Sequence, residues 1–262
     1  MRLIISFVLL SLFSSFRPEG FVLVNGLPFS PARTMTIDAI GNIYVVSDNQ
    51  LLKFDADGRP LQNFSDYRQG ELRSVDAGNA MKVVLFYPDM ARLVVLGTQF
   101  APQSTIELRN IGIVQPTVVC NSVNNGYWVY DLQDFQLKKI DLNLQPVFFS
   151  GNLMQLTGRR VLPNFMLEYD HRVYMNDPSS GILVFDQFGS YLKTISISGL
   201  TDFQIVGNEL LCMQDNHLIA LDLRMLNERE ITLPEHGSMK GARINERRYY
   251  LLTTDSLNIY SY

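Results

Sequence analysis

Residues 41–58, GNIYVVSDNQLLKFDADG, contain two short apolar runs separated by a turn that includes Asp48. Short apolar runs rich in Val, Ile and Tyr and bounded by Asp, Asn and Gly are typical of buried β-strands. The same pattern occurs six times along the chain. The acids that end the first run of each copy are Asp48, Asp89, Asp131, Asp177, Asp215 and Asp255. Their spacings of 41, 42, 46, 38 and 40 residues indicate an internal structural repeat.

Each repeat contains further strand-like segments on both sides of this pair. A short stretch such as TMTID precedes the first run, and a fourth stretch such as PLQNFS follows the second. Four short strands in about 40 residues are the unit of a β-propeller blade. We therefore predict an all-β, six-bladed propeller with four strands per blade. The ring must close, because each blade has two apolar faces and only a neighbour on each side removes both from water.

The last repeat predicts how the ring closes. It ends at Tyr262 after three strands, whereas FVLVN, residues 21–25, is a strand-like segment without a repeat of its own. We expect this N-terminal segment to be the missing outer strand of the last blade.

The N-terminus, MRLIISFVLLSLFSSF, has the pattern of a secretory signal. Arg2 is followed by a largely apolar segment of 11 residues, Leu3–Phe13, which is shorter than the roughly 20 residues that a membrane-spanning helix needs. We predict a signal peptide over residues 1–16 and a single propeller domain over residues 17–262. The expected location is periplasmic, with no membrane span after cleavage.

Charge and cysteine content narrow the classes of partner and cofactor. The net charge of −4 argues against nucleic acid as the partner. Cys120 and Cys212 are the two cysteines, and each lies in an apolar run without a second Cys or a His at metal-ligand spacing. We expect buried free thiols, and neither a metal nor a cofactor.

The repeated polar residues suit turns better than catalysis. Asp accepts hydrogen bonds from backbone N–H groups two residues onward. A second series follows the first strand of each repeat: Asp38, Asp76, Asn121, Asp170, Asn208 and Asn245. No nucleophile motif or phosphate-binding loop is present, and the histidines are His171, His217 and His236. A metal-dependent hydrolase or lactonase propeller gathers carboxylates in its channel. Glu168 and Asp202 are the candidates for that role here, but no local signature supports it. We therefore predict no catalytic residues.

Arginines near the starts of first strands are the predicted binding residues. In a propeller, the connections that lead from one blade to the first strand of the next border one mouth of the channel. A cluster of guanidinium groups there would bind carboxylates. Tyr67 and Arg68, in the loop SDYRQGE, are residue types enriched in interfaces. The predicted ligand- or partner-binding residues are Arg33, Tyr67, Arg68, Arg73, Arg160 and Arg243.

The stretch GNIYVVSDNQLLKFDADGRPLQNF resembles blades of the six-bladed NHL- and TolB-like propellers. The compact exported form also resembles periplasmic propellers of Bacteroidota, such as the PorD-type accessory subunits of the type IX secretion translocon. That resemblance implies a scaffold in a cell-envelope complex and assigns no functional residues. We therefore expect a non-enzymatic propeller with a protein partner in the cell envelope. The alternatives are a metal-dependent hydrolase or lactonase, and a binding module for small acidic ligands.

Overall fold

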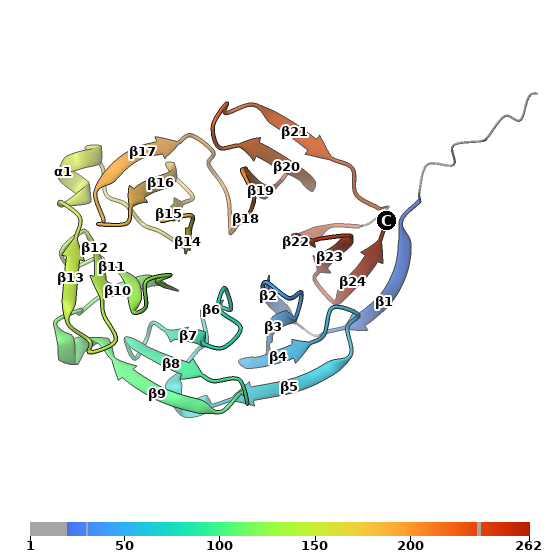
Figure 1. Cartoon of the computed structure of the whole chain (residues 1–262), viewed down its shortest axis with the longest axis horizontal. Coiled ribbons are helices and arrows are strands. Elements are labelled where there is room, and N and C mark those ends of the chain that lie inside the picture. Colours follow the sequence, from blue (N-terminus) through green and yellow to red (C-terminus); the bar gives the residue numbers. More distant parts are fainter. Residues whose placement is uncertain (1–19, 30, 235–236) are drawn as a thin grey trace, which may run out of the picture.

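The computed structural model describes residues 20–29, 31–234 and 237–262, which form six antiparallel sheets of four strands each. The predicted signal peptide, residues 1–16, lies outside this part of the chain. Figure 1 shows the sheets arranged as blades around a common centre. The prediction of a six-bladed all-β propeller is confirmed.

The blades follow one another in sequence, and each begins with its innermost strand (Figure 1). Blades 1 and 2 consist of β2 (Ala32–Ile37), β3 (Ile43–Ser47), β4 (Gln50–Phe54) and β5 (Pro60–Ser65), and of β6 (Ser74–Asp76), β7 (Val83–Tyr87), β8 (Arg92–Leu96) and β9 (Pro102–Glu107). Blades 3 and 4 consist of β10 (Pro116–Asn121), β11 (Tyr127–Asp131), β12 (Gln136–Ile140) and β13 (Pro146–Phe149), and of β14 (Phe165–Tyr169), β15 (Arg172–Asp177), β16 (Gly181–Asp186) and β17 (Tyr191–Ile195).

Blade 5 consists of β18 (Gln204–Val206), β19 (Glu209–Gln214), β20 (His217–Asp222) and β21 (Glu228–Ile231), and blade 6 of β22 (Met239–Asn245), β23 (Arg248–Thr253), β24 (Ser256–Ser261) and β1 (Val22–Pro28). In the described residues, helical structure is limited to the connections between blades: α1 (Leu153–Thr157) and the 3-10 turns η1 (Tyr67–Gln69) and η2 (Leu108–Ile111). No helix in the described part of the chain has the length and apolar character needed to cross a membrane.

The N-terminal strand closes the ring as predicted. β1 pairs antiparallel with β24, from Val22 opposite Ser261 to Pro28 opposite Ser256. The ring of Phe21 packs edge-on against that of Tyr249, with centroids 5.2 Å apart. The two ends of the propeller are therefore joined by backbone pairing and apolar contact.

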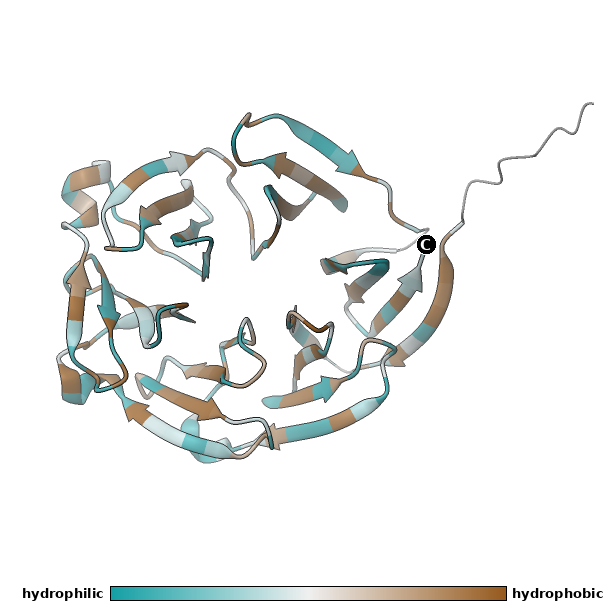
Figure 2. Ribbon diagram, in the orientation of Figure 1, coloured by the Kyte–Doolittle hydropathy of each residue, from teal (hydrophilic) through white to brown (hydrophobic). Residues whose placement is uncertain are grey.

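The core is divided among the junctions between blades. The described residues form six apolar clusters, and each contains residues from two neighbouring blades. Figure 2 shows that apolar residues dominate middle strands such as β7 and β8, whereas outer strands such as β5 and β9 alternate with polar ones. Trp128 is fully buried in the junction between blades 3 and 4. Cys120 and Cys212 are buried free thiols, as expected.

Two of the acids that end the second strands, Asp131 and Asp177, bind the backbone of the turn that follows. Asp131 accepts from the backbone N–H of Gln133 at 3.2 Å and from the Lys138 ammonium at 2.9 Å. Burial by itself would raise the pKa of Asp131. The hydrogen bonds from Lys138 and from backbone N–H groups outweigh it and hold the pKa below its ordinary value. Asp177 makes an equivalent bond to the N–H of Ser179 at 2.9 Å.

Candidate functional site

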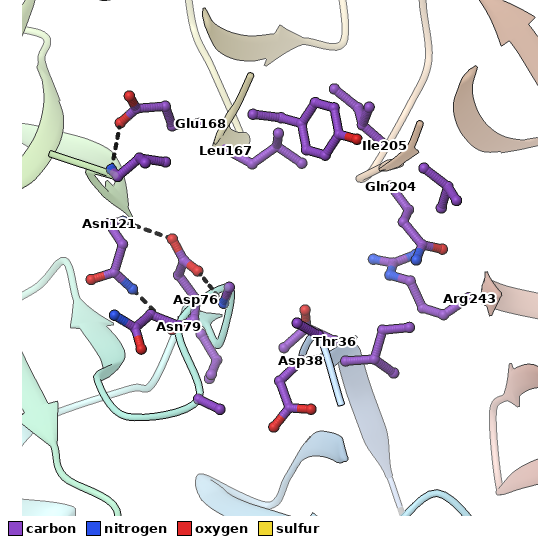
Figure 3. A pocket seen from close by; sticks show the side chains of 18 of the residues that line it. Thr36, Asp38, Asp76, Asn79, Asn121, Leu167, Glu168, Gln204, Ile205 and Arg243 are labelled. Atoms are coloured by element: carbon purple, nitrogen blue, oxygen red, sulfur yellow. Dashed lines mark hydrogen bonds between the residues drawn. The ribbon is translucent and has the colours of Figure 1, made fainter. Parts of the chain in front are cut away.

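The first strands end around a cavity of about 900 Å³ that opens at one end of the central channel. We call this cavity the channel mouth. All six blades contribute to it (Figure 3), through residues 36–39, 75–76 and 78–82, 121–123 and 125, 165–169, 203–207 and 243–246. In five blades the segment includes part of the turn that follows the innermost strand, whereas in blade 4 it is β14 itself. The repeat thus places part of every blade at the same opening.

The second polar series lies partly in this wall. Asp38, Asp76, Asn121 and Asn245 line the channel mouth, whereas Asp170 and Asn208 are not among its lining residues. Asp38 is buried and accepts hydrogen bonds from the backbone N–H groups of Ile40 and Asn42 and from the Tyr44 hydroxyl at 3.0 Å. Burial, followed by the charge and hydrogen bond of Asp38, raises the pKa of Tyr44 well above its ordinary value. Asp38 thus stabilises its own hairpin.

Asp76 and Asn121 join blades 2 and 3. The backbone N–H of Asn121 donates to Asp76 Oδ2 at 2.7 Å, and the Asn121 amide donates to the carbonyl oxygen of Lys82 at 3.2 Å (Figure 3). Burial raises the pKa of Asp76 although these hydrogen bonds and the charge of Lys82 oppose it. Desolvation likewise lowers the pKa of Lys82. Both residues are half-buried and contact blade 3, Asp76 through Asn121 and Lys82 through the carbonyl oxygen of Gly126.

Glu168 joins blades 4 and 3. Its Oε2 accepts from the indole N–H of Trp128 at 2.8 Å and from the backbone N–H of Val123 at 3.1 Å. Figure 3 shows the second of these bonds at the edge of the opening. One carboxylate thus anchors the buried Trp128 and fixes the turn of the neighbouring blade.

Blades 5 and 6 are joined by an ion pair and an amide bridge. Arg243 Nη2 lies 3.0 Å from Asp202 Oδ1, and Arg243 is 5% exposed. The side chain of Gln204 accepts from the backbone N–H of Ile244 at 2.9 Å and donates to its carbonyl oxygen at 2.8 Å. The polar groups of the wall described so far therefore connect strands, within a hairpin or between blades.

The remaining wall of the channel mouth is largely apolar. Ile37, Val75, Leu167, Ile205 and Ile244 lie on its inner surface.

Three further side chains stand at the edge of the channel mouth: Met81, Val123 and Val206, which are 64%, 63% and 44% exposed. We call these three residues the apolar rim. They belong to the turns of blades 2 and 3 and to the end of β18 in blade 5. Solvated apolar groups around a concavity are the usual mark of an interaction site.

The predicted binding residues do not form one cluster. Arg33 lies at the start of β2, and Arg73 and Arg160 precede β6 and β14, at the opposite end of the first strands from the channel mouth. Arg33 pairs with Glu71. Arg243 instead lies inside β22, and it is the one predicted binding residue whose side chain lines the channel mouth.

Tyr67 and Arg68 lie in η1, between blades 1 and 2. Tyr67 is 63% exposed, and its hydroxyl accepts from Gln50 Nε2 at 3.2 Å. Arg68 pairs with Asp66 at 2.9 Å. Hydrogen bonds from Arg68 and Gln69 lower the pKa of Asp66 to about 2. The guanidinium groups of Arg33, Arg68 and Arg243 are thus each paired with an acid of the chain itself.

The apolar rim was not predicted from the sequence, because the prediction considered the polar residues of the repeat. A signal for it is present, because an apolar residue stands in several of the turns after first strands. Ile40, 74% exposed, occupies the corresponding turn of blade 1. A search for apolar residues inside otherwise polar turns would have found these positions.

The groups that a metal-dependent enzyme would need do not come together in the described residues. Glu168 lines the channel mouth and Asp202 lies beside Arg243, but both are engaged with neighbouring blades. Within residues 20–29, 31–234 and 237–262, no group of three or more His, Cys, Asp and Glu side chains could hold a metal ion. His171 and His217 lie outside the lining, and His236 is outside the described residues.

Comparison with known proteins supports the fold and goes no further. No protein-family profile and no curated protein sequence matches the chain. A solved structure of virginiamycin B lyase from Staphylococcus aureus matches with a TM-score of 0.64 and 11% identity, covering 92% of this chain and 99% of the lyase. The WD40 domain of Neurospora crassa Pan2 matches with a TM-score of 0.60 and 8% identity, covering 94% and 96% of the two chains. At such identities the similarity establishes a propeller and carries no activity over.

Proposed function

We propose that this chain is an exported, non-enzymatic propeller that binds another protein at the channel mouth and serves as a scaffold or accessory subunit of a cell-envelope complex. The observation that carries the proposal is the apolar rim around an apolar-lined concavity. Met81 and Val123 are each more than 60% exposed although they border a cavity whose wall includes apolar side chains such as Leu167 and Ile244. Covering such side chains removes them from water and stabilises a complex.

A protein partner fits this geometry better than a small molecule does. A ligand enclosed in the cavity would contact inner-wall residues such as Leu167 and Ile244 but would leave the rim in water. A protein segment that enters the channel mouth, with flanking residues outside it, covers the inner wall and the rim together. The rigid ring of blades holds the turns in place, so little ordering cost opposes binding.

The state of the polar groups supports a binding role over catalysis. A general base or nucleophile needs a partner within reach and an atom free to meet the substrate. In the channel mouth, Asp38 is bound within its own hairpin, Glu168 to Trp128, and Arg243 to Asp202. Stable binding of a divalent ion by the purified protein would instead favour the hydrolase alternative.

The cell-envelope part of the proposal is supported by the sequence. The N-terminal pattern favours export, and the compact blade repeat resembles periplasmic propellers of the PorD type. A role in type IX secretion is the most specific form of this proposal.

Two methionines at opposite ends of blade 2 allow a matched test. Met81 belongs to the rim, whereas Met90 lies in the turn between β7 and β8, at the other end of the blade, and is 42% exposed. Burial of a Met or Val side chain contributes roughly 1.5–3 kcal/mol, so Met81→Ser and Val123→Ser should each weaken binding about tenfold or more. Met90→Ser should leave binding unchanged.

The assay is capture from native envelopes by tagged protein, with quantitative mass spectrometry of what is recovered. We expect the unmodified chain and Met90→Ser to recover the same protein in stoichiometric amount, and Met81→Ser and Val123→Ser to lose it. Recovery of the chain alone under mild extraction, or equal loss in all three variants, would contradict the proposal. Equal melting temperatures among the variants show that the fold is intact.

A further inference from the structure

Acidic residues outnumber basic residues in the lining of the channel mouth. Four acids from four different blades line it: Asp38, Asp76, Glu168 and Glu246. Two cations, Lys82 and Arg243, belong to the same lining. The carboxylates therefore outnumber the cations before any pairing is considered.

Pairing widens the imbalance, because the ion pair of Arg243 is with an acid outside the lining. Arg243 is paired with Asp202 at 3.0 Å. Lys82 interacts electrostatically with Asp76, and its ammonium lies 4.0 Å from the centre of the Tyr127 ring. The positive charges of Arg243 and Lys82 are thus engaged with other groups of the protein.

Three acids remain without a cationic partner. Among the described residues, no ion pair involves Asp38, Glu168 or Glu246. Asp38 and Glu168 are held by neutral donors, which leave their net charge in place. Glu246 is exposed in the turn between β22 and β23. The channel mouth thus combines apolar walls with uncompensated negative charge from three blades.

We propose that the segment received by the channel mouth is apolar and carries a positive charge, supplied by a Lys or Arg side chain. This inference rests on the proposed function and names the chemistry of the partner. A concave site with low-dielectric walls concentrates the field of its charges, so a cation gains more there than on an open surface. An acidic segment meets uncompensated carboxylates and no free guanidinium, which reverses the charge preference expected from the arginine pattern of the sequence.

The first arm of the test uses three capped pentapeptides that differ at one position: acetyl-Leu-Val-X-Val-Leu-amide, in which X is Lys, Gln or Glu. Binding to the whole folded chain is measured by titration calorimetry at about 0.02 M and about 0.3 M salt. We expect the Lys peptide to bind roughly tenfold more tightly than the Gln peptide at low salt, and the Glu peptide most weakly. The difference between Lys and Gln should shrink at the higher salt concentration, because screening weakens the attraction.

The second arm removes the charge from the protein. Glu246→Gln changes an exposed rim side chain, and Glu168→Gln keeps an acceptor for Trp128 while removing the charge. Each should reduce the Lys-to-Gln preference roughly threefold. Asp215→Asn is the matched control: Asp215 is exposed in the turn between β19 and β20, at the other end of blade 5, and its positive φ of 47° suits Asn equally.

The outcomes separate this inference from the proposed function. Equal binding of the Lys and Gln peptides would overturn the charge preference while leaving rim-dependent partner capture intact. A failure of all three peptides to bind a chain that still captures its partner through Met81 would also overturn it. Loss of the Lys preference in Asp215→Asn as well as Glu246→Gln would show a general charge effect and no site. If Met81→Ser leaves partner capture unchanged, the proposed function fails instead.

Discussion

The ion pair between Asp202 and Arg243 gives a quantitative test of how neighbouring blades are held together. Only 6% of the Arg243 side chain and 18% of the Asp202 side chain are exposed. Asp202→Ala leaves the guanidinium buried, with the carbonyl oxygen of Ala242 at 2.9 Å as its remaining acceptor. Removing one partner of a buried pair costs roughly 3–5 kcal/mol. The partial exposure of Asp202 places the expected loss near the lower end, at about 3 kcal/mol.

The loss is measurable by urea unfolding, followed through the fluorescence of the single, fully buried Trp128. For a chain of this size, 1 kcal/mol corresponds to a shift of roughly 2–4 °C in melting temperature, so Asp202→Ala should lower it by about 6–12 °C. Arg243→Met should cost less, because the acid that remains is more accessible to water. The double variant should be more stable than the sum of the two single losses predicts, by about 2 kcal/mol.

Additive losses in the double variant would refute the reasoning, because they would show that the two charges do not depend on each other. The same set also decides the role of Arg243, which the sequence analysis placed among the binding residues. If the pair acts within the wall, the double variant should capture the partner as well as the unmodified chain does. Loss of partner capture in a folded double variant would instead indicate that Arg243 contacts the partner.

Three further predictions concern the fold. A chain that begins at Phe29 should melt well below one that begins at Gly20, because it lacks the outer strand of blade 6; equal melting temperatures would contradict the closure seen here. Gly126→Ala should destabilise by several kcal/mol, since φ is +83° and a Cβ would overlap the backbone of the adjacent strand, and a urea midpoint near that of the unmodified chain would contradict this. The pKa values of Asp131 and Asp177 are lowered by folding, so their contribution to stability is complete above about pH 4 and is lost as pH falls through the lower folded-state values. Urea midpoints between pH 5 and pH 2 should fall accordingly, and a pH-independent midpoint would contradict the assignment.

The repeat determined the architecture from sequence alone. Strand pattern, turn acids such as Asp48 and a period near 41 residues are local properties of the chain, and an element with two apolar faces has few ways to bury both. The position of residues 21–25 was predicted in the same way, because the last repeat lacked its fourth strand and this segment belonged to no other repeat. These predictions succeeded because the interactions behind them lie within one blade or follow from counting strands.

The site depended on contacts between blades, which local sequence does not encode. Glu168 reaches Trp128 and Asp202 reaches Arg243 across about 40 residues of sequence, and these contacts decide which charges are neutralised. Sequence placed Arg243 with the other arginines, but a shift of a few residues along an innermost strand moves a side chain from one end of the channel to the other. The chain therefore specifies a six-bladed ring through short-range pattern. Only closure of that ring decided that the exposed apolar turns and the uncompensated carboxylates meet at one opening.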